Sequence, residues 1–277
     1  MIKDSAFAKI NWALSVKNKR EDGFHELSSI MSRIDLHDVV SYEIDKDYNI
    51  TMTDNSISFG SNLINKVAID FFKKINEKPR GHFSVEKEIP MQAGLAGGST
   101  DATAALKLLN RAFGNPLSRK DLLEILNRHG SDLAFFVYDK DALVTSRGEV
   151  VTPLDSGIEA HLVLIKPSMS MSTPEVYREL KREEYSNIDS SAMVEHFYKK
   201  EYNYLVNDLE APAFRLLPLL KELKENIKRD SIFSLMSGSG SVIFAVYENK
   251  RDQERAYQRL SLNDLWVKKA CTTGGIK

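Results

Sequence analysis

The sequence contains a single cysteine, Cys271, among 277 residues. One thiol cannot form a disulfide bond within the chain, which is typical of proteins from a reducing compartment. The six histidines show no metal-ligand spacing, and the chain has neither a Cys-x-x-Cys pair nor a Gly-x-Ser-x-Gly nucleophile elbow. Because zinc hydrolases and acyl transferases depend on such motifs, the residues give no support to either class.

The chain also lacks a long hydrophobic run and a surplus of one charge. No stretch reaches the roughly eighteen apolar residues of a membrane span, and residues 1–14 contain no signal-peptide core. The 38 basic and 39 acidic side chains leave a formal net charge of −1. Proteins that bind nucleic acid or acidic membranes usually carry a basic surplus. We therefore expect a cytoplasmic protein that binds neither and that holds any anion by local design.

Hydrophobic periodicity predicts two domains, residues 1–156 and 157–277. In the first, it predicts strands at 6–16, 39–44, 50–53 and 82–87, a strand pair or single strand at 142–151, and helices at 62–75, 101–113 and 121–129. The two short strands in the Asp- and Asn-rich segment favour a hairpin or meander. In the second domain, it predicts strands at 162–165, 232–236, 242–247 and 265–269 and helices at 175–181, 189–198, 216–226 and 251–260. That order indicates an antiparallel sheet covered by helices on one face.

The strongest functional signal is the segment from Pro90 to Asp101, PMQAGLAGGSTD, which follows a predicted strand and opens an alanine-rich helix. Small residues let the backbone approach a bulky anion, and the first helical turn offers unpaired N–H groups and the positive end of the helix dipole. Ser99 and Thr100 add hydroxyls for phosphate or Mg²⁺. The glycine spacing fits neither a Walker A loop nor a dinucleotide fingerprint. The alternative interpretation is a flexible turn capped by Ser99.

A second glycine-rich segment, residues 236–241 (MSGSGS), lies between two predicted strands. Taken alone, it is a tight turn. As a partner of the first loop, it would close over the substrate or the phosphates from the other domain.

A few polar residues occupy unusual positions. Lys9 and Asn11 share one face of an otherwise apolar predicted strand, and Asp132 leads into the apolar run 133–137. Local sequence favours a helix N-cap for Asp132 and an edge-strand surface position for Lys9; the alternative is that these groups lie in a cleft. His25 follows a predicted turn, where a histidine usually has a structural role.

Taken together, these segments resemble the GHMP kinase superfamily over nearly the whole chain. The resemblance rests on residues 8–11 (AKIN), 20–27 (REDGFHEL), 62–64 (NLI), 90–102, 130–136 (GSDLAFF), 172–177 (STPEVY), 207–210 (NDLE) and 236–240 (MSGSG). The REDGFHEL and STPEVY segments narrow it to the branch that acts on a diphosphocytidyl alcohol of the non-mevalonate isoprenoid pathway. The implied fold is α+β, with an N-terminal domain like ribosomal S5 domain 2, a ferredoxin-like C-terminal domain, and the active site in the cleft between them.

The resemblance also implies an activity, the ATP-dependent phosphorylation of the 2-position hydroxyl of that alcohol. It makes Asp132 the catalytic aspartate, which takes or orients the proton of the attacking hydroxyl, with Lys9 beside it. A nearby cation would keep the carboxylate ionised. Asn11 would orient the substrate.

The implied binding residues form three groups. Phe24 and Tyr177 would sandwich the cytosine ring, and His25 would read its edge. The residues implied to bind ATP are Asn62, Lys87, Pro90, Gly94, Gly97, Gly98, Ser99 and Thr100, and those that border the substrate diphosphate are Gly238 and Ser239. Mg²⁺ would arrive with the nucleotide, with no metal site built by the protein itself. We expect no partners beyond ATP and the small-molecule substrate, and a monomer or weak homodimer.

The chain departs from the family pattern at a few positions. Gln92 and Ala96 replace glycines that are usual in the loop, Ala134 replaces a common proline, and Phe24 replaces a more usual tyrosine. These departures leave two alternatives open. One is a kinase for a different small alcohol or phosphoalcohol, such as a mevalonate- or homoserine-like substrate, and the other is a nucleotide-binding homologue without catalytic activity.

Overall fold

The computed structural model describes residues 1–53, 59–261 and 265–274, which form two compact units. Unit 1 consists of Met1–Ala8, Leu36–Met91 and Ala96–Asp139. Unit 2 consists of Lys9–Asp35, Gln92–Leu95 and the described part of Lys140–Lys277. These units divide the chain by contacts rather than by sequence order, and the predicted domain boundary between residues 156 and 157 stays a prediction.

Two long strands open the chain, β1 (Ile2–Lys19) and β2 (His25–Glu43), and they pair with each other. The turn between them is closed by the amide of Arg20, which donates to the carbonyl oxygen of Phe24 at 2.8 Å. Gly23 occupies this turn with φ 85°, a left-handed conformation that favours glycine. The prediction of strands at 6–16 and 39–44 was too short, because most of β2 is buried on both faces and shows no alternation.

In unit 1, β4 (Gly81–Glu86) lies between β2, to which it is antiparallel, and β3 (Tyr48–Met52), to which it is parallel. The predicted hairpin or meander of residues 39–53 is therefore wrong. Parallel strands need a crossover connection, and the helix α1 (Leu63–Lys74) supplies it between β3 and β4.

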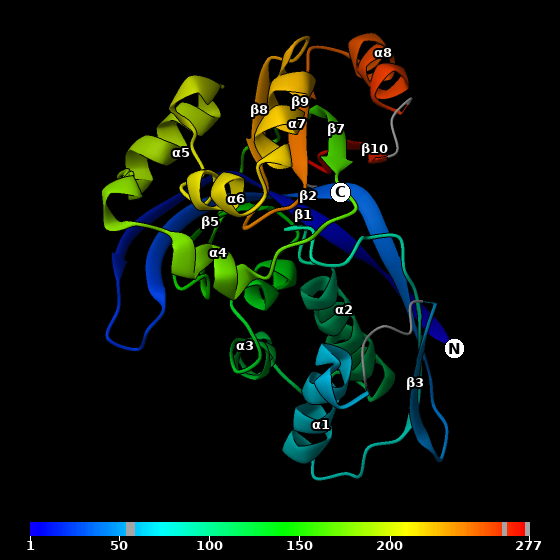
Figure 1. Ribbon diagram of the computed structural model, residues 1–277. Coiled ribbons are helices and arrows are strands. Elements are labelled where there is room, and N and C mark those ends of the chain that lie inside the picture. Colours follow the sequence, from blue (N-terminus) through cyan, green and yellow to red (C-terminus); the bar gives the residue numbers. More distant parts are fainter. Residues whose placement is uncertain (54–58, 262–264, 275–277) are drawn as a thin grey trace. The chain divides into compact units, whose positions relative to one another are not determined.

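Three helices of unit 1 cover one face of this sheet (Figure 1). They are α1, α2 (Gly97–Ala112) and α3 (Arg119–Asn127), and two short 3₁₀ helices, η1 (Phe59–Ser61) and η2 (Asp132–Val137), complete the unit. Apolar residues of all three α-helices pack with Val40, Tyr42, Phe83 and Val85 of the strands in one core. The predicted helix at 62–75 matches α1, with Asn62 as its N-cap.

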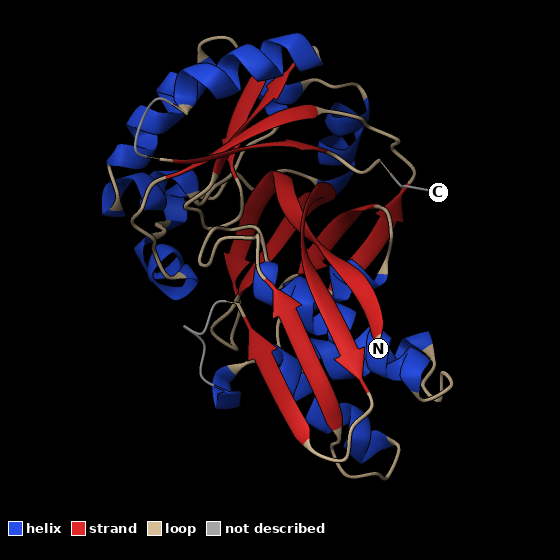
Figure 2. Cartoon of the chain, turned by 90° about the vertical axis from the view of Figure 1, so that its right-hand side faces the viewer, coloured by secondary structure: helices blue, strands red, loops and turns tan. Residues whose placement is uncertain are grey.

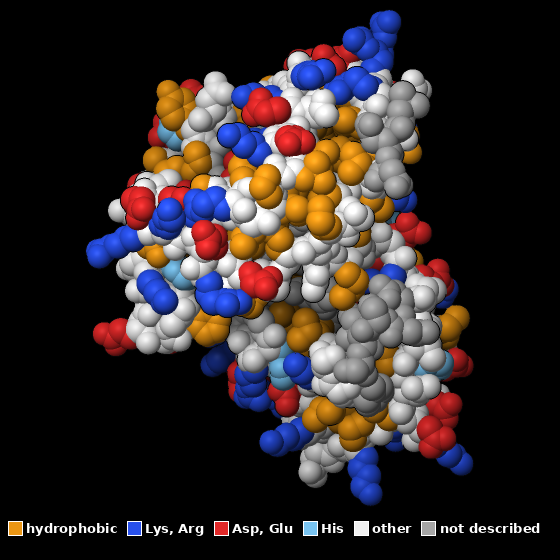
Figure 3. Space-filling view, in the orientation of Figure 1, with side chains coloured by type: hydrophobic (Ala, Val, Ile, Leu, Met, Phe, Trp, Pro, Cys, Tyr) orange, Lys and Arg blue, Asp and Glu red, His pale blue; other side chains and the backbone are white. Residues whose placement is uncertain are grey.

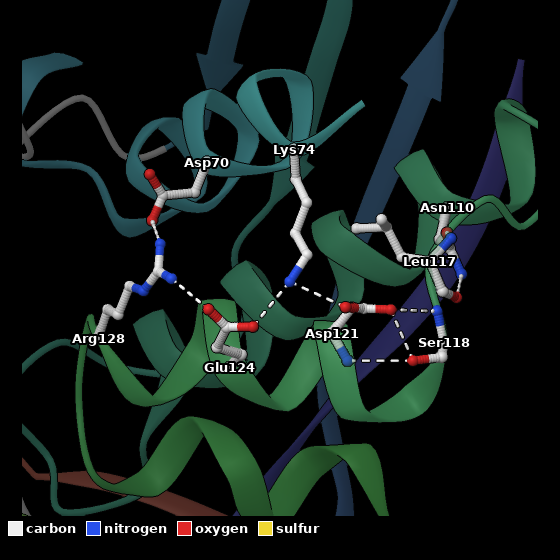
Figure 4. A network of polar contacts seen from close by, with 8 residues as sticks. All are labelled: Asp70, Lys74, Asn110, Leu117, Ser118, Asp121, Glu124 and Arg128. Carbon is white, nitrogen blue, oxygen red and sulfur yellow. Dashed lines mark hydrogen bonds and ion pairs between the residues drawn. The ribbon is translucent and has the colours of Figure 1, made fainter. Parts of the chain in front are cut away.

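A polar network ties the outer helices of unit 1 together (Figure 4). Nζ of Lys74 on α1 lies 2.8 Å from Asp121 and 2.7 Å from Glu124, both on α3. Asp121 also closes a capping box with Ser118 at the start of α3. Because exposed ion pairs contribute little stability, the network mainly fixes the orientation of α3.

In unit 2, β2 pairs through its first half with β5 (Asp141–Ser146), which pairs with β6 (Val150–Leu154). A second sheet contains β7 (His161–Lys166), β8 (Phe233–Met236), β9 (Ile243–Tyr247) and β10 (Trp266–Cys271). Its order is β10-β7-β9-β8, and all neighbours are antiparallel. Helices connect the first to the second strand and the third to the fourth, which is the ferredoxin-like pattern that the resemblance implied. The strands and helices of this part of the chain are seen in the upper half of Figure 2.

The helices of unit 2 are α4 (Thr173–Glu179), α5 (Ser190–Tyr198), α6 (Glu210–Leu216), α7 (Leu219–Lys228) and α8 (Lys250–Leu260), with η3 (Arg182–Glu184) and η4 (Tyr202–Tyr204) between them. Residues of α4, α6, α7 and α8 pack on the same face of the sheet as Val163, Ile165, Ile243 and Ala245, which confirms the one-sided cover. The sequence missed α6, since Pro212 reads as a helix breaker. It lies in the first turn of α6, where a missing N–H costs no intrahelical bond.

Basic and acidic side chains are interspersed on the face shown in Figure 3, as the near-zero net charge leads one to expect. Among the described residues, no helix combines the length and the apolar character needed to span a bilayer.

Candidate active site

In unit 2, the ammonium group of Lys9 lies where two glycine-rich segments meet. Its Nζ donates to Oδ1 of Asn11 at 2.6 Å and to the carbonyl oxygen of Gly94 at 2.9 Å. A Cβ added to Gly238 would lie 3.3 Å from the same Nζ. Only 2% of Lys9 is exposed, so the surface position that local sequence favoured is wrong. The side chain of Lys9 is instead buried, with hydrogen bonds to Asn11 on the same strand and to Gly94 of the first segment.

The backbones of the two glycine-rich segments approach each other closely at Gly94. This residue has φ +75°, and a Cβ added to it would lie 1.9 Å from the carbonyl oxygen of Ser237. Oγ of Ser237 donates to the carbonyl oxygen of Gly94 at 3.0 Å, and the amide of Val242 donates to the carbonyl oxygen of Ala93 at 3.1 Å. The second segment therefore packs on the first and is more than an isolated tight turn.

A buried amide fixes the second segment from behind. Nδ2 of Asn207 donates to the carbonyl oxygens of Met236 at 2.7 Å and Gly238 at 2.8 Å. The hydroxyls of Ser239 and Thr173 lie 2.8 Å apart, so Ser239 is bonded to the first residue of α4. Both residues predicted to border a diphosphate, Gly238 and Ser239, are thus held in a defined loop.

In unit 1, helix α2 begins at Gly97, four residues before the predicted start, so Gly97, Gly98, Ser99 and Thr100 form its first turn. Among the described residues, no side chain caps this helix: Ala96 is the N-cap and makes no side-chain bond. The amides of Ser99 and Thr100 donate back to the carbonyl oxygen of Ala96 at 3.1 Å and 3.0 Å. A long helix with an uncapped glycine start presents N–H groups and a positive dipole end, which favour a phosphate.

Both loop positions at which this chain departs from glycine keep a glycine-like conformation. The φ angle is 48° at Gln92 and 57° at Ala96, within the left-handed region. Each side chain there costs about 1–2 kcal/mol relative to a right-handed conformation. The backbone of the loop is therefore preserved although two of its glycines are replaced.

A buried ion cluster supports the loop from below. Nζ of Lys87 lies 2.5 Å from Oδ2 of Asp38 and 2.6 Å from Oδ2 of Asp101. Oδ1 of Asp38 also accepts the amide of Ile89 at 2.8 Å. Since Asp38 lies on β2, Lys87 follows β4 and Asp101 lies on α2, this cluster joins the strands to the start of α2.

The same cluster lies directly beneath the first helical residue. A Cβ added to Gly97 would lie 3.0 Å from Cγ2 of Ile89 and 3.5 Å from Nζ of Lys87. Pro90 follows Ile89 and leads into the loop. The two carboxylates compensate the charge of Lys87, and nucleotide contacts by Lys87 and Pro90 stay predictions.

The cluster perturbs the ionisation of its members. Burial raises the pKa of Asp101 to about 7, against the opposing effect of Lys87, and the neighbouring Asp38 adds to the increase. Burial also disfavours the charge on Lys87, but the two carboxylates outweigh it and raise the pKa of the lysine. Oδ1 of Asp101 is a buried oxygen without a hydrogen-bond partner among the described residues.

The candidate catalytic aspartate, Asp132, is the first residue of η2, and Ser131 occupies the N-cap position. The N-cap role that local sequence favoured for Asp132 is therefore wrong. Oγ1 of Thr103 on α2 donates to the carbonyl oxygen of Leu133 at 3.1 Å, so the segment that carries Asp132 is bonded to the helix of the glycine-rich loop. Lys9 belongs to unit 2, and the meeting of Asp132 with Lys9 stays a prediction.

The three residues predicted to hold a cytosine lie in unit 2. His25 stacks on Tyr177 with ring centroids 5.1 Å apart and an interplanar angle of 25°, and Tyr185 lies edge-on to His25 at 6.0 Å. Phe24 is 51% exposed, and the guanidinium of Arg147 lies 5.0 Å from its ring centroid. The structure thus brings His25 and Tyr177 into contact.

The imidazole of His25 is disposed to stay neutral. Burial lowers its pKa, and the positive charge of Lys19 lowers it further. A neutral imidazole offers one donor and one acceptor nitrogen, the combination that a base edge requires.

Asn62, which the resemblance places near adenine, caps α1. Its Oδ1 accepts the amide of Ile64 at 2.9 Å, and its Nδ2 lies 3.1 Å from Sδ of Met52. Contact with adenine stays a prediction, because the cap accounts for Asn62 without a ligand.

Comparisons with known proteins agree with this geometry. Residues 62–140 match the GHMP kinases N terminal domain, and residues 193–263 match the GHMP kinases C terminal domain. The chain is 38% identical over 266 residues to the 4-diphosphocytidyl-2-C-methyl-D-erythritol kinase of Thermodesulfovibrio yellowstonii, covering 92% of this chain and 93% of the relative. It is also 38% identical to the enzyme of that name from Listeria welshimeri, with 92% and 91% covered. The chain belongs to the GHMP kinases.

Solved structures of GHMP kinases share the fold. A crystal structure of 4-(cytidine 5'-diphospho)-2C-methyl-D-erythritol kinase matches with a TM-score of 0.84 at 29% identity, covering 98% of this chain and 99% of that one. A mevalonate kinase matches with a TM-score of 0.70 at 11% identity, covering 98% and 99%, which is a likeness of fold alone. The predicted two-domain α+β GHMP kinase fold is confirmed.

Sequence reasoning missed several residues that build this GHMP kinase site. Asp38 gave no signal because an isolated carboxylate in a strand pattern looks like a surface residue, and Asp101 was included only as the end of the glycine-rich segment, with no role of its own. Ser237 and Asn207 lie in segments that carried the resemblance, but only the folded chain brings them together. The missed residues with direct contacts to predicted ones are Asp38, Asp101, Ser237, Asn207, Ser29, Arg147 and Tyr185.

Gly94→Ala is expected to destabilise the protein by about 2 kcal/mol or more, because the methyl group would meet a backbone oxygen in a left-handed conformation. Urea unfolding measures the loss. Gly60→Ala is the matched control, since a Cβ added there meets nothing within 4 Å. Equal stability of the two variants would contradict the close approach.

The stability of the wild type relative to Asp101→Asn is expected to fall as pH rises from about 4 to 7. A carboxyl group whose pKa is about 7 in the folded state binds more protons than the unfolded chain does in this window, so unfolding becomes easier with pH. Chemical denaturation at several pH values gives the difference. Glu175→Gln should show the opposite slope below about pH 4.3, since hydrogen bonds from Ser172 lower the pKa of Glu175. A pH-independent difference for Asp101→Asn would refute the assignment.

Proposed function

We propose that this protein is an ATP-dependent kinase that phosphorylates the 2-position hydroxyl of 4-diphosphocytidyl-2-C-methyl-D-erythritol, a step toward isoprenoid precursors. One observation carries the proposal. The uncapped, glycine-started helix α2 is bonded through Thr103 to the segment that begins with Asp132. The proposed anion site and the proposed catalytic carboxylate would thereby share one framework, as phosphoryl transfer to a hydroxyl requires.

In the proposed reaction, the hydroxyl oxygen of the alcohol attacks the terminal phosphorus of ATP, and the bond to the bridging oxygen of ADP breaks. Asp132 accepts or orients the proton of the attacking hydroxyl. Lys9, buried and held by Asn11 and Gly94, supplies a fixed positive charge and steadies the substrate. Asn11 is itself fixed, because its Nδ2 donates to Oγ of Ser29 at 2.8 Å.

The nucleotide phosphates are proposed to bind at the first turn of α2, where Gly97 and Gly98 admit a bulky anion and Ser99 and Thr100 add hydroxyls. Among the described residues, no group of three or more His, Cys, Asp or Glu side chains is arranged to hold a metal ion. Mg²⁺ enters the proposal as part of the nucleotide complex, where it would neutralise phosphate charge. We further propose that the protein acts in the cytoplasm and that its partners are ATP and the small-molecule alcohol.

The cytidyl end is proposed to bind beside Phe24, His25 and Tyr177. The imidazole of His25, whose pKa is lowered and which lies against Tyr177, forms hydrogen bonds with the edge of the cytosine. The rings of Phe24 and Tyr177 stack on the faces of the cytosine. The names of the relatives from Thermodesulfovibrio yellowstonii and Listeria welshimeri support a cytidyl substrate.

Asp132→Asn should lower kcat by about 10²-fold or more while ATP still binds, because the amide cannot take the proton. Steady-state kinetics and nucleotide titration measure the two quantities. Asp139→Asn is the control, since this nearby carboxyl has a 67% exposed side chain. An unchanged rate for Asp132→Asn would exclude the proposed role.

Phe24→Ala and Tyr177→Ala should each raise KM for the cytidyl substrate by about 5- to 150-fold, the equivalent of one lost base stack, with little change in ATP affinity. Tyr204→Ala is the matched control, because it removes a similar stack, on His196 at 4.3 Å. Assays of ATP consumption with mevalonate, phosphomevalonate, homoserine and galactose test the other substrate classes. Faster turnover of one of these than of the cytidyl alcohol would reassign the substrate.

A further inference from the structure

The aromatic ring of Phe24 has an unusual setting for a binding residue. It lies at the turn between β1 and β2 with 51% of its surface exposed, where a side chain is ordinarily free to change rotamer. The guanidinium carbon of Arg147 lies 5.0 Å from the centroid of this ring. A guanidinium at this distance is attracted to the ring face.

Arg147 is itself held in place at the turn between β5 and β6. Its amide donates to Oε2 of Glu149 at 2.9 Å, and its Nε lies 3.6 Å from Oε1 of the same carboxylate. Oγ of Ser146 donates to Oε1 of Glu149 at 3.0 Å, so the carboxylate fixes both residues of the turn. The guanidinium therefore projects from a braced turn rather than from a free loop.

A second arginine joins the two turns. Nη1 of Arg20 donates to Oγ of Ser146 at 2.9 Å and to Oε2 of Glu26 at 2.7 Å. Arg20 also closes the turn that carries Phe24, through its backbone bond to that residue. Hydrogen bonds of Arg20 thus connect the turn that carries Phe24 to the turn that carries Arg147, which keeps the guanidinium against the ring.

We propose that Arg147 is a positioning residue that holds the Phe24 ring ready to stack on the cytosine of the substrate. This inference rests on the proposed function. An aromatic ring has two faces, and a cation on one face leaves the other for a base. Ordering an exposed side chain only when the ligand arrives weakens binding, so a ring that is ordered in advance binds more tightly.

Both the charge and the planar shape of the Arg147 guanidinium contribute to its contact with the Phe24 ring. A lysine at this position keeps the charge but presents no flat group to the ring, and a glutamine removes the charge. A role in general stability predicts instead that loss of the guanidinium lowers the unfolding midpoint and changes KM for both substrates alike.

The test measures Arg147→Gln and Arg147→Lys in two versions of the protein, one with the native Phe24 and one with Phe24→Leu. Each variant is compared with the same protein that keeps Arg147. Arg147→Gln is expected to raise KM for the cytidyl alcohol about 2- to 10-fold, with kcat and the KM for ATP unchanged, and Arg147→Lys to fall between. In the Phe24→Leu background the effect of Arg147→Gln should disappear, since coupling through one contact is lost with either partner. Arg119→Gln is the control, because it removes a comparable contact with the ring of Tyr138 at 5.6 Å.

Calorimetric binding of CDP provides a readout that does not depend on turnover. A KM increase that persists without the Phe24 ring overturns the inference, as does an unchanged KM. A KM that falls shows that Arg147 competes with the base, which also overturns it. If the cytidyl alcohol is not phosphorylated but CDP binds with the same coupling, the inference stands and the proposed function fails; absence of both turnover and CDP binding removes both.

Discussion

The contact on which the site in unit 2 depends is the close approach of two backbones, at Gly94 and Ser237. Because a Cβ on Gly94 would lie 1.9 Å from the carbonyl oxygen of Ser237, only glycine allows the segments to meet. Their meeting creates the oxygen environment in which the ammonium of Lys9 is buried, bonded to Gly94 and Asn11. Burying a cation is costly unless hydrogen bonds replace its hydration, so the glycine and the lysine depend on each other.

In unit 1, the start of helix α2 has no side-chain cap from the described residues and is supported by other contacts. The first turn of α2 has no side-chain cap within the described part of the chain, which leaves the helix without the usual stabilisation at that end. The ion cluster of Lys87, Asp38 and Asp101 joins this turn to β2 and β4 from below. Its carboxylates compensate one ammonium at distances of 2.5 and 2.6 Å, so the cluster joins the three elements through paired charges.

The aromatic side chains of Phe24, His25 and Tyr177 in unit 2 are also held by contacts within the folded chain. His25 is fixed by a stack on Tyr177 and an edge contact with Tyr185, and its neighbour Phe24 lies against Arg147. Tyr177 belongs to α4, whose end is bonded by Arg215 through the carbonyl oxygen of Glu179 at 2.7 Å. These contacts order the rings in the folded chain itself, which is the condition for selective stacking on a base.

The sequence by itself determined the two glycine-rich segments, because small residues and turns are local signals. Its motifs also carried the resemblance to the GHMP kinases, and that resemblance implied the ferredoxin-like second domain. The sequence did not determine the pairing of β4 between β2 and β3, since strand neighbours depend on the crossover that α1 makes. Nor did it reveal Ser237, Asp38 or Arg147, whose roles come from contacts between segments far apart in the chain. Burial of Lys9 and the true N-cap before Asp132 were likewise decided by packing, because local preference is weak against the tertiary contacts that surround a residue.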